Sequence, residues 1–206
     1  QSRETVNMGK ISHKSKCSKN SRSTYDLKGG NRMDLLEVMR TRRSIRSYKD
    51  EKVSEADIIK ILDAGMLSAS GKGIRPWEFV VVEDKDILQS LSGCRAGGVK
   101  MLREASCAIA VVGNKEASDV WIEDCSTVMG NMHLMAHAIG LGSCWVQGRL
   151  RKAEDGRDTE DYVRDILGYP EQYGLLAILT IGVPDEEKEG YVLNELPIEK
   201  IHREKF

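Results

Sequence analysis

The sequence predicts one α+β or α/β domain, because two kinds of segment alternate along it. Four apolar runs have the length of buried strands, and five or six segments between them repeat their apolar residues with the spacing of a helix. Neither an internal repeat nor a linker to a second domain interrupts this order. The chain has 206 residues, 40% of them hydrophobic, which is enough for one core or for one subunit of an oligomer.

The first half of the expected domain opens with two helices. One begins near Met33, where apolar residues share a stripe ahead of a basic cluster. The second should start at Ser54, because Ser54 and Asp57 form an S-x-x-D pattern, in which a side chain satisfies free N–H groups at the helix start. The run EFVVVE at 78–83 predicts a buried strand. The elements expected next are short helices near 86–91 and 99–105 and a strand at 108–112.

A long helix is expected over residues 119–139, where apolar positions keep a helical period until Gly140 ends it. The elements after it are a strand at 143–147, a helix at 159–167 ended by Gly168 and Pro170, and a strand at 175–181. Residues 184–206 are acidic and irregular. His133 and His137 stand one turn apart on the long helix, but no third ligand lies nearby in the sequence, so they indicate ordinary helix residues rather than a metal site.

The net charge of -1 hides an uneven distribution. Residues 1–32 hold eight Lys and Arg against Glu4 and Asp26, so they carry about +6 and leave about -7 on residues 33–206. They also lack a sustained apolar period, which indicates a disordered basic leader or an expression tag, with a basic arm that touches a partner as the alternative. The acidic remainder argues against a nucleic-acid-binding surface.

Several absences bear on the compartment and on metals. No stretch approaches the roughly 18 uncharged apolar residues of a membrane span, and the first residues lack the apolar core of a secretory signal. The five cysteines are scattered and form no CxxC pair, so neither a disulfide framework nor a cysteine-built zinc site is expected. The sequence therefore predicts a cytoplasmic protein with no metal and no membrane contact.

The first segment with marked polar chemistry is RRSIR at residues 42–46. Three guanidiniums and a hydroxyl suit a phosphate, because arginine offers forked and permanently charged donors. In an extended stretch Arg42, Ser44 and Arg46 would face the same side. The alternative is a solvated basic turn that pairs with the acidic remainder of the chain.

The second segment, SASGKGIRPW at residues 68–77, joins the second helix to the first strand. Its small residues and two glycines allow backbone amides to approach a ligand closely. The pattern GxxxxGK[ST] is absent and no GxGxxG follows a strand, so neither a Walker loop nor a Rossmann site is predicted. The alternative is a plain helix-to-strand loop with a tryptophan in the core.

The third segment, GLGSCWVQ at residues 140–147, is a glycine-rich turn that leads into a strand. It places backbone donors and acceptors beside an aromatic ring, as recognition of a flat heterocycle requires. The alternative is a helix end with a buried cysteine and tryptophan. The chain shows no Ser/His/Asp constellation, no HExxH and no marked carboxylate pair, so no catalytic side chain is predicted and a cofactor would carry the hard step of any reaction.

In this order the segments resemble the FMN-dependent nitroreductase family, from about Met33 to the C-terminus. The motifs that carry the resemblance are MDLLEVMRTRRSIRSYKDEKVS, SASGKGIRPWEFVVV, AIGLGSCWV and ILTIGVP, before a tail ending LPIEKIHREKF. The resemblance implies an α+β subunit with a mixed sheet flanked by helices. It also implies an intertwined homodimer with one FMN at each of two interface sites, so that residues 33–206 would form an FMN-binding domain.

The resemblance further assigns cofactor contacts to the three segments. The arginine-serine segment would grip the phosphate and ribityl chain of FMN, the small-residue loop would reach the flavin from the other subunit, and the turn after the long helix would lie along the isoalloxazine ring. The implied cofactor-binding residues are Arg42, Arg43, Ser44, Arg46, Ala69, Ser70, Gly71, Gly73, Ser143, Cys144 and Trp145. The C-terminal segment would wrap around the partner subunit.

The implied activity is that of an FMN-dependent NAD(P)H oxidoreductase. NADH or NADPH would give hydride to N5 of the flavin, and a nitroaromatic, quinone or related acceptor would take the electrons in a ping-pong cycle. The chain departs from the commoner family pattern at Ala69, Gly73 and Arg75, and Glu195 stands where a basic residue would help to hold the phosphate. The alternatives are a flavin protein of the same fold with other chemistry, such as dehalogenation or dehydrogenation, or one with little turnover.

Overall fold

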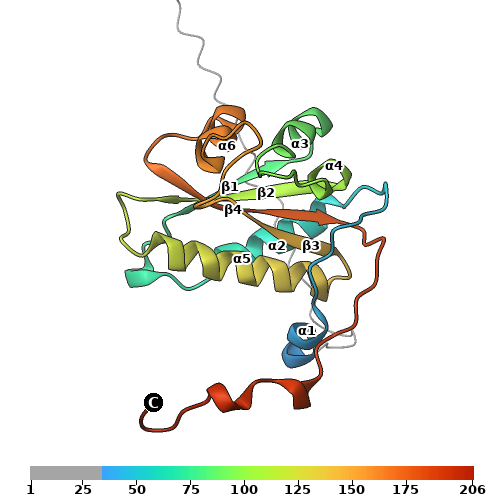
Figure 1. The fold of residues 1–206 in the computed structure, drawn as a ribbon, viewed down its shortest axis with the longest axis vertical. Coiled ribbons are helices and arrows are strands. Elements are labelled where there is room, and N and C mark those ends of the chain that lie inside the picture. The colour runs from blue at the N-terminus through green and yellow to red at the C-terminus, as the bar shows by residue number, and fades with distance from the viewer. Residues whose placement is uncertain (1–33) are drawn as a thin grey trace, which may run out of the picture. The chain divides into compact units, whose positions relative to one another are not determined.

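Four strands form one sheet, and helices cover both of its faces (Figure 1). A computed structural model describes residues 34–206, so the predicted leader at residues 1–32 lies outside the described residues. The sheet has the order β1-β2-β4-β3. Its strands are β1 (Trp77–Val82), β2 (Cys107–Asn114), β3 (Gly142–Gln147) and β4 (Tyr173–Gly182).

All three strand pairs within residues 34–206 are antiparallel. The α+β class is confirmed, whereas the expected mixture of parallel and antiparallel pairs does not occur among these strands. The reason is that β4 lies between β2 and β3 and pairs antiparallel with both. Since β2 and β3 run in the same direction but are not neighbours, the sheet contains no parallel pair of them.

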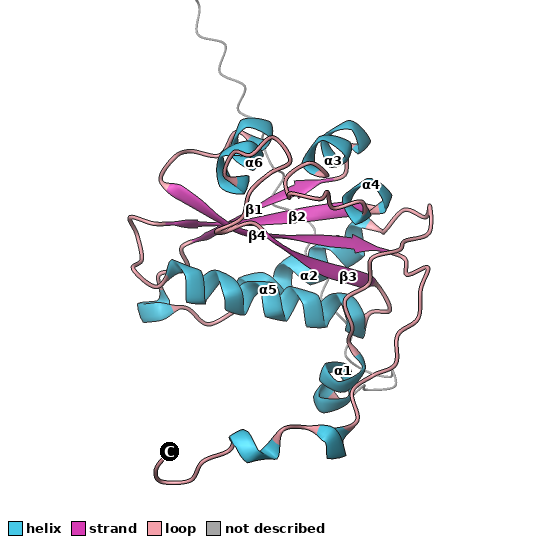
Figure 2. Ribbon diagram, viewed as in Figure 1, coloured by secondary structure: helices cyan, strands magenta, loops and turns pink. Residues whose placement is uncertain are grey.

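Alternate residues of the central strands point into two separate cores, as the two-residue period of a strand requires. In β2, Cys107, Ile109 and Val111 belong to the core under α2 and α5, while Ala108 and Ala110 belong to the core on the other face. Figure 2 shows α5 below the sheet and α3, α4 and α6 above it. The helices of the two layers are α2 (Glu55–Met66), α5 (Trp121–Ala138), α3 (Lys85–Leu91), α4 (Met101–Glu104) and α6 (Thr159–Leu167).

The expected helix boundaries have clear chemical causes in the structure. The side chain of Ser54 accepts a hydrogen bond from the backbone N–H of Asp57 and so begins α2. Helix α6 ends at Gly168, whose φ of 71° is the left-handed conformation that glycine adopts without strain. Gly140, with φ of 84°, plays the same part just after α5. The order of helices and strands expected from the sequence is confirmed.

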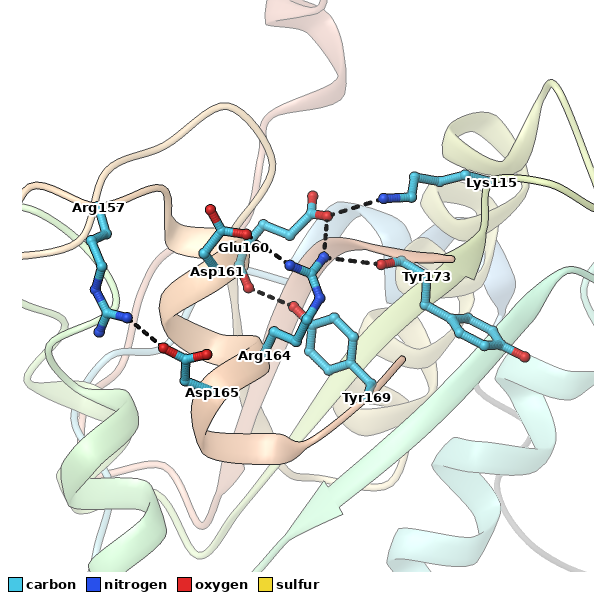
Figure 3. A network of polar contacts seen from close by, with 8 residues as sticks. All are labelled: Lys115, Arg157, Glu160, Asp161, Arg164, Asp165, Tyr169 and Tyr173. Carbon is cyan, nitrogen blue, oxygen red and sulfur yellow. Dashed lines mark hydrogen bonds and ion pairs between the residues drawn. The ribbon is translucent and has the colours of Figure 1, made fainter. Parts of the chain in front are cut away.

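A network of charged side chains ties α6 to the beginning of β4 (Figure 3). The guanidinium of Arg164 contacts the carboxylates of Glu160 at 2.6 Å and Asp161 at 2.7 Å, and it donates to the carbonyl of Tyr173 at 3.3 Å. Lys115 lies 3.5 Å from the same Glu160 carboxylate. This network fastens α6 on the face of the sheet opposite α5, away from the three segments described above.

The C-terminal segment passes beside α1 (Leu35–Thr41). The backbone N–H of Tyr191 donates to the carbonyl of Arg40 at 2.8 Å, and the Arg40 side chain donates to the Tyr191 carbonyl at 3.3 Å. After this contact every residue is exposed, including the two short 3-10 turns Leu193–Glu195 and Ile198–Lys200. The C-terminal segment therefore has no core of its own within the described chain.

Candidate functional site

The arginine-serine segment runs from α1 to the ends of β3 and β4. The backbone N–H of Ile45 donates to the carbonyl of Ser143 at 3.0 Å, which brings the first and third predicted segments side by side. The hydroxyl of Tyr48 lies 2.7 Å from both the carbonyl of Ile45 and the hydroxyl of Thr180 in β4. These contacts fix the segment against the edge of the sheet.

Arg42 and Ser143 are joined through a buried histidine. Nη1 of Arg42 lies 2.8 Å from Nε2 of His133, and Nδ1 of His133 lies 2.5 Å from Oγ of Ser143. A guanidinium can only donate, so Nε2 accepts, and Nδ1 carries the proton that it donates to Ser143. Burial, the charge of Arg42 and the nearby His137 lower the pKa of His133 to about 4, so the ring is neutral near pH 7.

The next residue back along the chain is held in the same manner. The hydroxyl of Thr41 donates to the carbonyl of Glu37 at 2.7 Å, so its oxygen accepts from Nε2 of His137 at 2.8 Å. Burial and then the charge of Arg42 lower the pKa of His137. Two histidines one turn apart on α5 therefore hold Thr41 and Arg42, the pair of residues where α1 gives way to the arginine-serine segment.

Arg43 and Arg46 have other surroundings. The Arg43 guanidinium donates to the carbonyl of Glu189 and lies 4.9 Å from the centre of the Tyr191 ring, so its side chain faces the C-terminal segment. The backbone N–H of Arg46 donates to the carboxylate of Glu186 at 2.5 Å. This bond is the main cause of the lowered pKa of Glu186.

Lys188 also belongs to this part of the molecule. Its ammonium donates to the carbonyl of Ser44 at 2.8 Å and to the Glu186 carboxylate at 3.0 Å. Lys188, Arg43, Ile45 and His137 are among the residues that line a cleft of about 640 Å³. The wall of the cleft carries these two cations together with the carboxylates of Glu37, Glu186 and Glu187.

The small-residue loop is fastened to a different face of α5. The backbone N–H of Gly71 donates to the carboxylate of Asp124 at 2.8 Å, and the side-chain amide of Asn131 donates to the hydroxyl of Ser68 at 2.8 Å. Asp124 and Asn131 are seven residues apart and share one face of the helix. Two side chains from α5 therefore hold the loop at Ser68 and at Gly71, on either side of Ala69 and Ser70.

The backbone of this loop is unusual. Lys72, Gly73 and Arg75 all have positive φ values, of 53°, 70° and 54°. Left-handed conformations of residues other than glycine are uncommon, and they tend to persist where surrounding contacts hold them. The hydroxyl of Ser70 supplies one such contact, because it accepts from the backbone N–H of Arg75 at 3.0 Å. The side chains of Lys72 and Arg75 are exposed.

In β3 the side chain of Cys144 is buried and that of Trp145 is half-buried. Burial raises the pKa of the Cys144 thiol, so it stays protonated near pH 7 and is no activated nucleophile. The indole N–H of Trp145 donates to the side-chain oxygen of Gln147 at 2.8 Å, which fixes the ring plane. This half of the predicted site is rigid because β3 also pairs with β4 along its whole length.

Within one chain the structure brings together only two of the three predicted segments. His133 and Asp124, which hold the arginine-serine segment and the small-residue loop, are nine residues apart on α5, or about 14 Å along its axis. Nine residues are two and a half turns, so the two side chains point to opposite sides of a helix about 10 Å wide. The loop and the arginine-serine segment of the same chain therefore lie on opposite sides of α5.

Sequence reasoning missed four of the residues that organise these segments. The pair His133 and His137 was interpreted as ordinary helix residues, although the i, i+4 spacing marks one face. Nothing in the local sequence marked Asp124 or Lys188, because their partners are 53 and 144 residues away.

Residues 34–206 contain no cluster of three metal-binding side chains. They also contain no helix that is both long and apolar enough to cross a membrane.

Known proteins resemble this chain over most of its length. The model of the nitroreductase family matches residues 39–94 and 90–183. A protein of Archaeoglobus fulgidus, whose name proposes NADH dehydrogenase and NAD(P)H nitroreductase activity, is 36% identical over 178 residues, covering 84% of this chain and 99% of that protein.

Two solved structures extend the comparison to the fold. An FMN-dependent nitroreductase from Clostridium difficile R20291 has a TM-score of 0.80 at 43% identity, covering 83% of this chain and 99% of that one. A structure from Desulfovibrio desulfuricans, named as a proposed nitroreductase in complex with FMN, has a TM-score of 0.65 at 27% identity, covering 82% and 98% of the two chains.

The antiparallel sheet between two helical layers and the relatives together define an α+β oxidoreductase. The chain belongs to the nitroreductase family, since the family model and these relatives span most of it.

Proposed function

We propose that the protein is an FMN-dependent NAD(P)H oxidoreductase that reduces a nitroaromatic, quinone or related acceptor. The observation that carries the proposal is the guanidinium of Arg42. It is held by a neutral histidine beside the hydroxyl of Ser143, and within residues 34–206 it pairs with no carboxylate. A cation with its charge left uncompensated suits an anionic ligand such as the phosphate of FMN. The names of the Clostridium and Desulfovibrio structures, which mention FMN, support this choice.

Other donors of the arginine-serine segment would also suit a phosphate. Arg46 and the hydroxyl of Ser44 come from the same segment, and Lys188 lies against it through the Ser44 carbonyl. Glu195, which replaces the basic residue of the commoner family pattern, is exposed and far along the C-terminal segment. We assign to Lys188, whose ammonium also pairs with the Glu186 carboxylate, part of the positive charge that Glu195 does not supply. Arg43 would contribute less, because the C-terminal segment already occupies its guanidinium.

The residues of β3 fit the flat part of the same cofactor. Ser143 offers a hydroxyl, and Cys144 and Trp145 offer backbone groups on a strand that is fixed by its pairing with β4. When bound there, FMN would accept hydride from NADH or NADPH and pass electrons to the acceptor. The protein side chains would bind and orient the ligands, and none of them needs to form a covalent bond.

A second copy of the chain would complete the site. Residues 33–206 would then be an FMN-binding domain whose small-residue loop, with Ala69, Ser70, Gly71 and Gly73, reaches the flavin held by the partner. The separation of the loop from Arg42 across α5 supports this arrangement. An apolar groove of about 370 Å³ lies between α1, α2 and α5 and is lined by Leu35, Val38, Ala64, Leu67, Leu134 and Met135, among others. Its occupant in this proposal is the matching face of the second copy.

Exposed apolar side chains also support a dimer. Leu67 at the end of α2 is 84% exposed, and Leu196, Ile198 and Ile201 in the C-terminal segment are 46%, 73% and 68% exposed. Covering such side chains stabilises a complex by about 25 cal/mol per Å² of apolar surface removed from water. We expect the C-terminal segment to lie on the partner subunit.

The dimer has a test with a matched control. Leu67→Glu places a charge in the groove and should yield a folded monomer with weak FMN binding. Leu150→Glu changes a side chain that is 74% exposed and lies outside the groove, so it should remain dimeric. Light scattering after gel filtration measures both masses. A monomeric wild type, or a dimeric Leu67→Glu, would contradict this interface.

The activity is tested by the absorption spectrum of the purified full-length protein. Flavin bands that bleach anaerobically with NADH or NADPH, followed by parallel double-reciprocal lines with a quinone acceptor, are the expected result. A colourless protein that does not take up added FMN would refute the proposal. Flavin that binds but is reduced by neither nicotinamide would favour a binding protein with little turnover.

The cysteines bear on the compartment. Cys94, Cys107, Cys125 and Cys144, the cysteines of the described chain, are all free thiols. We therefore propose that the protein works in a reducing compartment, the cytoplasm.

A further inference from the structure

His133 is a polar side chain inside the protein, with both of its ring nitrogens in use. Its exposed fraction is 7%, and its neighbours along α5, Met129, Met132 and Ala136, belong to the core. A buried imidazole costs free energy unless its nitrogens are satisfied, and here Arg42 and Ser143 satisfy them at 2.8 Å and 2.5 Å. A fully satisfied buried network fixes one arrangement of its members.

The bond to Arg42 orients a cation without neutralising it. A carboxylate in the place of His133 would hold the guanidinium equally well, but it would cancel the positive charge that an anionic ligand needs. A neutral imidazole takes up one N–H of the guanidinium and leaves the charge and the remaining donors. Within residues 34–206 the Arg42 side chain has no other hydrogen-bond partner. The charge is therefore fixed in direction and still available.

The bond to Ser143 sets the direction of a hydroxyl. Because Nδ1–H of His133 donates to Oγ, one acceptor position of that oxygen is filled. The single proton of the Ser143 hydroxyl must then point away from the ring. One side chain of α5 thus orders a cationic donor from the arginine-serine segment and a neutral donor from β3.

We propose that His133 is a positioning residue that makes the site select a phosphorylated flavin, by aiming Arg42 at the phosphate and turning the Ser143 proton toward the ligand. This inference rests on the proposed function, since it names how one end of that site is built. The charged and titratable groups that face the ring are Arg42 from the arginine-serine segment and His137 from α5. The lowered pKa of His133 is consistent with a ring that stays a neutral acceptor.

Three substitutions separate the two bonds. In His133→Gln the amide oxygen can reach the position of Nε2 and accept from Arg42. In His133→Asn the shorter amide can reach the position of Nδ1 and donate to Ser143, while Arg42 loses its acceptor. His133→Leu removes both bonds at similar volume. Thr127→Val, an exposed position on the same helix, serves as the control for changes to α5 itself.

The measurement is the ratio of FMN affinity to riboflavin affinity, from flavin fluorescence titrations of the full-length protein after its flavin has been removed. The ratio cancels contacts to the ring, so it reports on the phosphate. We expect the ratio to fall about tenfold in His133→Leu and His133→Asn, as for the loss of one hydrogen bond to a charged group, and to stay near the wild-type value in His133→Gln. In an Arg42→Ala background His133→Leu should change the ratio no further.

A second measurement does not involve flavin. Nitrogen-15 NMR of the histidine ring should show His133 as the neutral Nδ1–H tautomer between pH 5 and 8, in line with its pKa of about 4. A ring that is protonated at pH 7, or the opposite tautomer, would overturn the assignment. A wild type that binds neither flavin would instead refute the proposed function. Normal wild-type binding with an unchanged ratio in His133→Leu would refute the role of His133 alone.

Discussion

The carboxylate of Asp124 accepts a hydrogen bond from the backbone N–H of Gly71 at 2.8 Å, and this bond fastens the small-residue loop to α5. Asp124 is only 5% exposed, and its other oxygen lies 3.4 Å from the hydroxyl of Ser118. The aspartate therefore sits between the loop and the chain that leads into α5. Its removal should affect the loop before it affects the sheet.

The first prediction concerns this anchor. Asp124→Ala should lower the free energy of unfolding by about 1–3 kcal/mol, because it leaves the Gly71 N–H without its partner. It should also increase the susceptibility of residues 69–75 to proteolysis. Asp124→Asn keeps an oxygen acceptor and should cost less. Urea denaturation and limited proteolysis measure the two effects. Equal stability of Asp124→Ala and the wild type would show that the bond contributes nothing.

A second prediction follows from the close approach of Gly71 to α5. A Cβ at this position would lie 2.8 Å from Cγ2 of Val120, closer than side chains normally approach. Gly71→Ala should therefore destabilise the protein by about 1–3 kcal/mol. Val120→Ala removes the clashing methyl group. In the Val120→Ala background, Gly71→Ala should therefore lower the stability much less than it does in the wild type. Thermal unfolding of the four proteins completes the cycle, and strict additivity would exclude the clash.

The arginines of the first segment should differ in their effect on FMN binding. Arg42→Ala should weaken binding by about 1.5–3 kcal/mol if a charge-assisted contact to the phosphate is lost. Arg43→Ala should weaken it less, since the Arg43 side chain faces Glu189 and Tyr191. Isothermal titration with FMN compares the two variants. A larger loss in Arg43→Ala than in Arg42→Ala would reverse the roles assigned to them.

Lys188 supplies a fourth prediction. Lys188→Met keeps most of the side-chain length but removes the charge and the bond to the Ser44 carbonyl. We expect weaker FMN binding and a smaller dependence of that binding on salt, because one cation near the phosphate is gone. The matched control is Lys52→Met, whose side chain is 81% exposed and pairs with Glu83 outside the site. Equal salt dependence in both variants would argue against a role for Lys188.

Stability should depend on pH through His133. The folded protein lowers its pKa to about 4, below the ordinary value of 6.5, so between these values the unfolded chain binds more protons than the folded one. The free energy of unfolding must then decrease as pH falls from about 6.5 to about 4, by up to about 3 kcal/mol from this residue. His133→Gln should have a flatter profile in urea unfolding at pH 7, 6 and 5. Parallel profiles would show that the ring is not buried neutral.

The sequence predicted the elements well where local chemistry defines their ends. Ser54 begins α2 and Gly168 ends α6 because the cap and the left-handed turn depend on neighbouring residues. The absence of parallel pairs among the strands of residues 34–206 could not be predicted, since it depends on β4 inserting between β2 and β3, which no local pattern marks.

The sequence indicated the segments of the candidate site but not the hydrogen bonds that hold these segments in place. Residue types marked the arginine-serine segment and the turn before β3 as candidates, and the family resemblance assigned them to a cofactor site. The bonds that hold them come from partners up to 144 residues away, such as His133 to Arg42 and Lys188 to Ser44. A histidine pair at i, i+4 has several common uses, and only the fold shows that this pair faces Thr41 and Arg42.

The number of residues in α5 between Asp124 and His133 is therefore constrained more tightly than the identity of those residues. One residue inserted or deleted there would turn one anchor by about 100° relative to the other and shift it by about 1.5 Å. Either the small-residue loop or the arginine-serine segment would then lose its partner. Core residues along this stretch can be exchanged for others of similar volume at modest cost. Adding or removing one residue would instead turn Asp124 and His133 out of their present alignment on the helix.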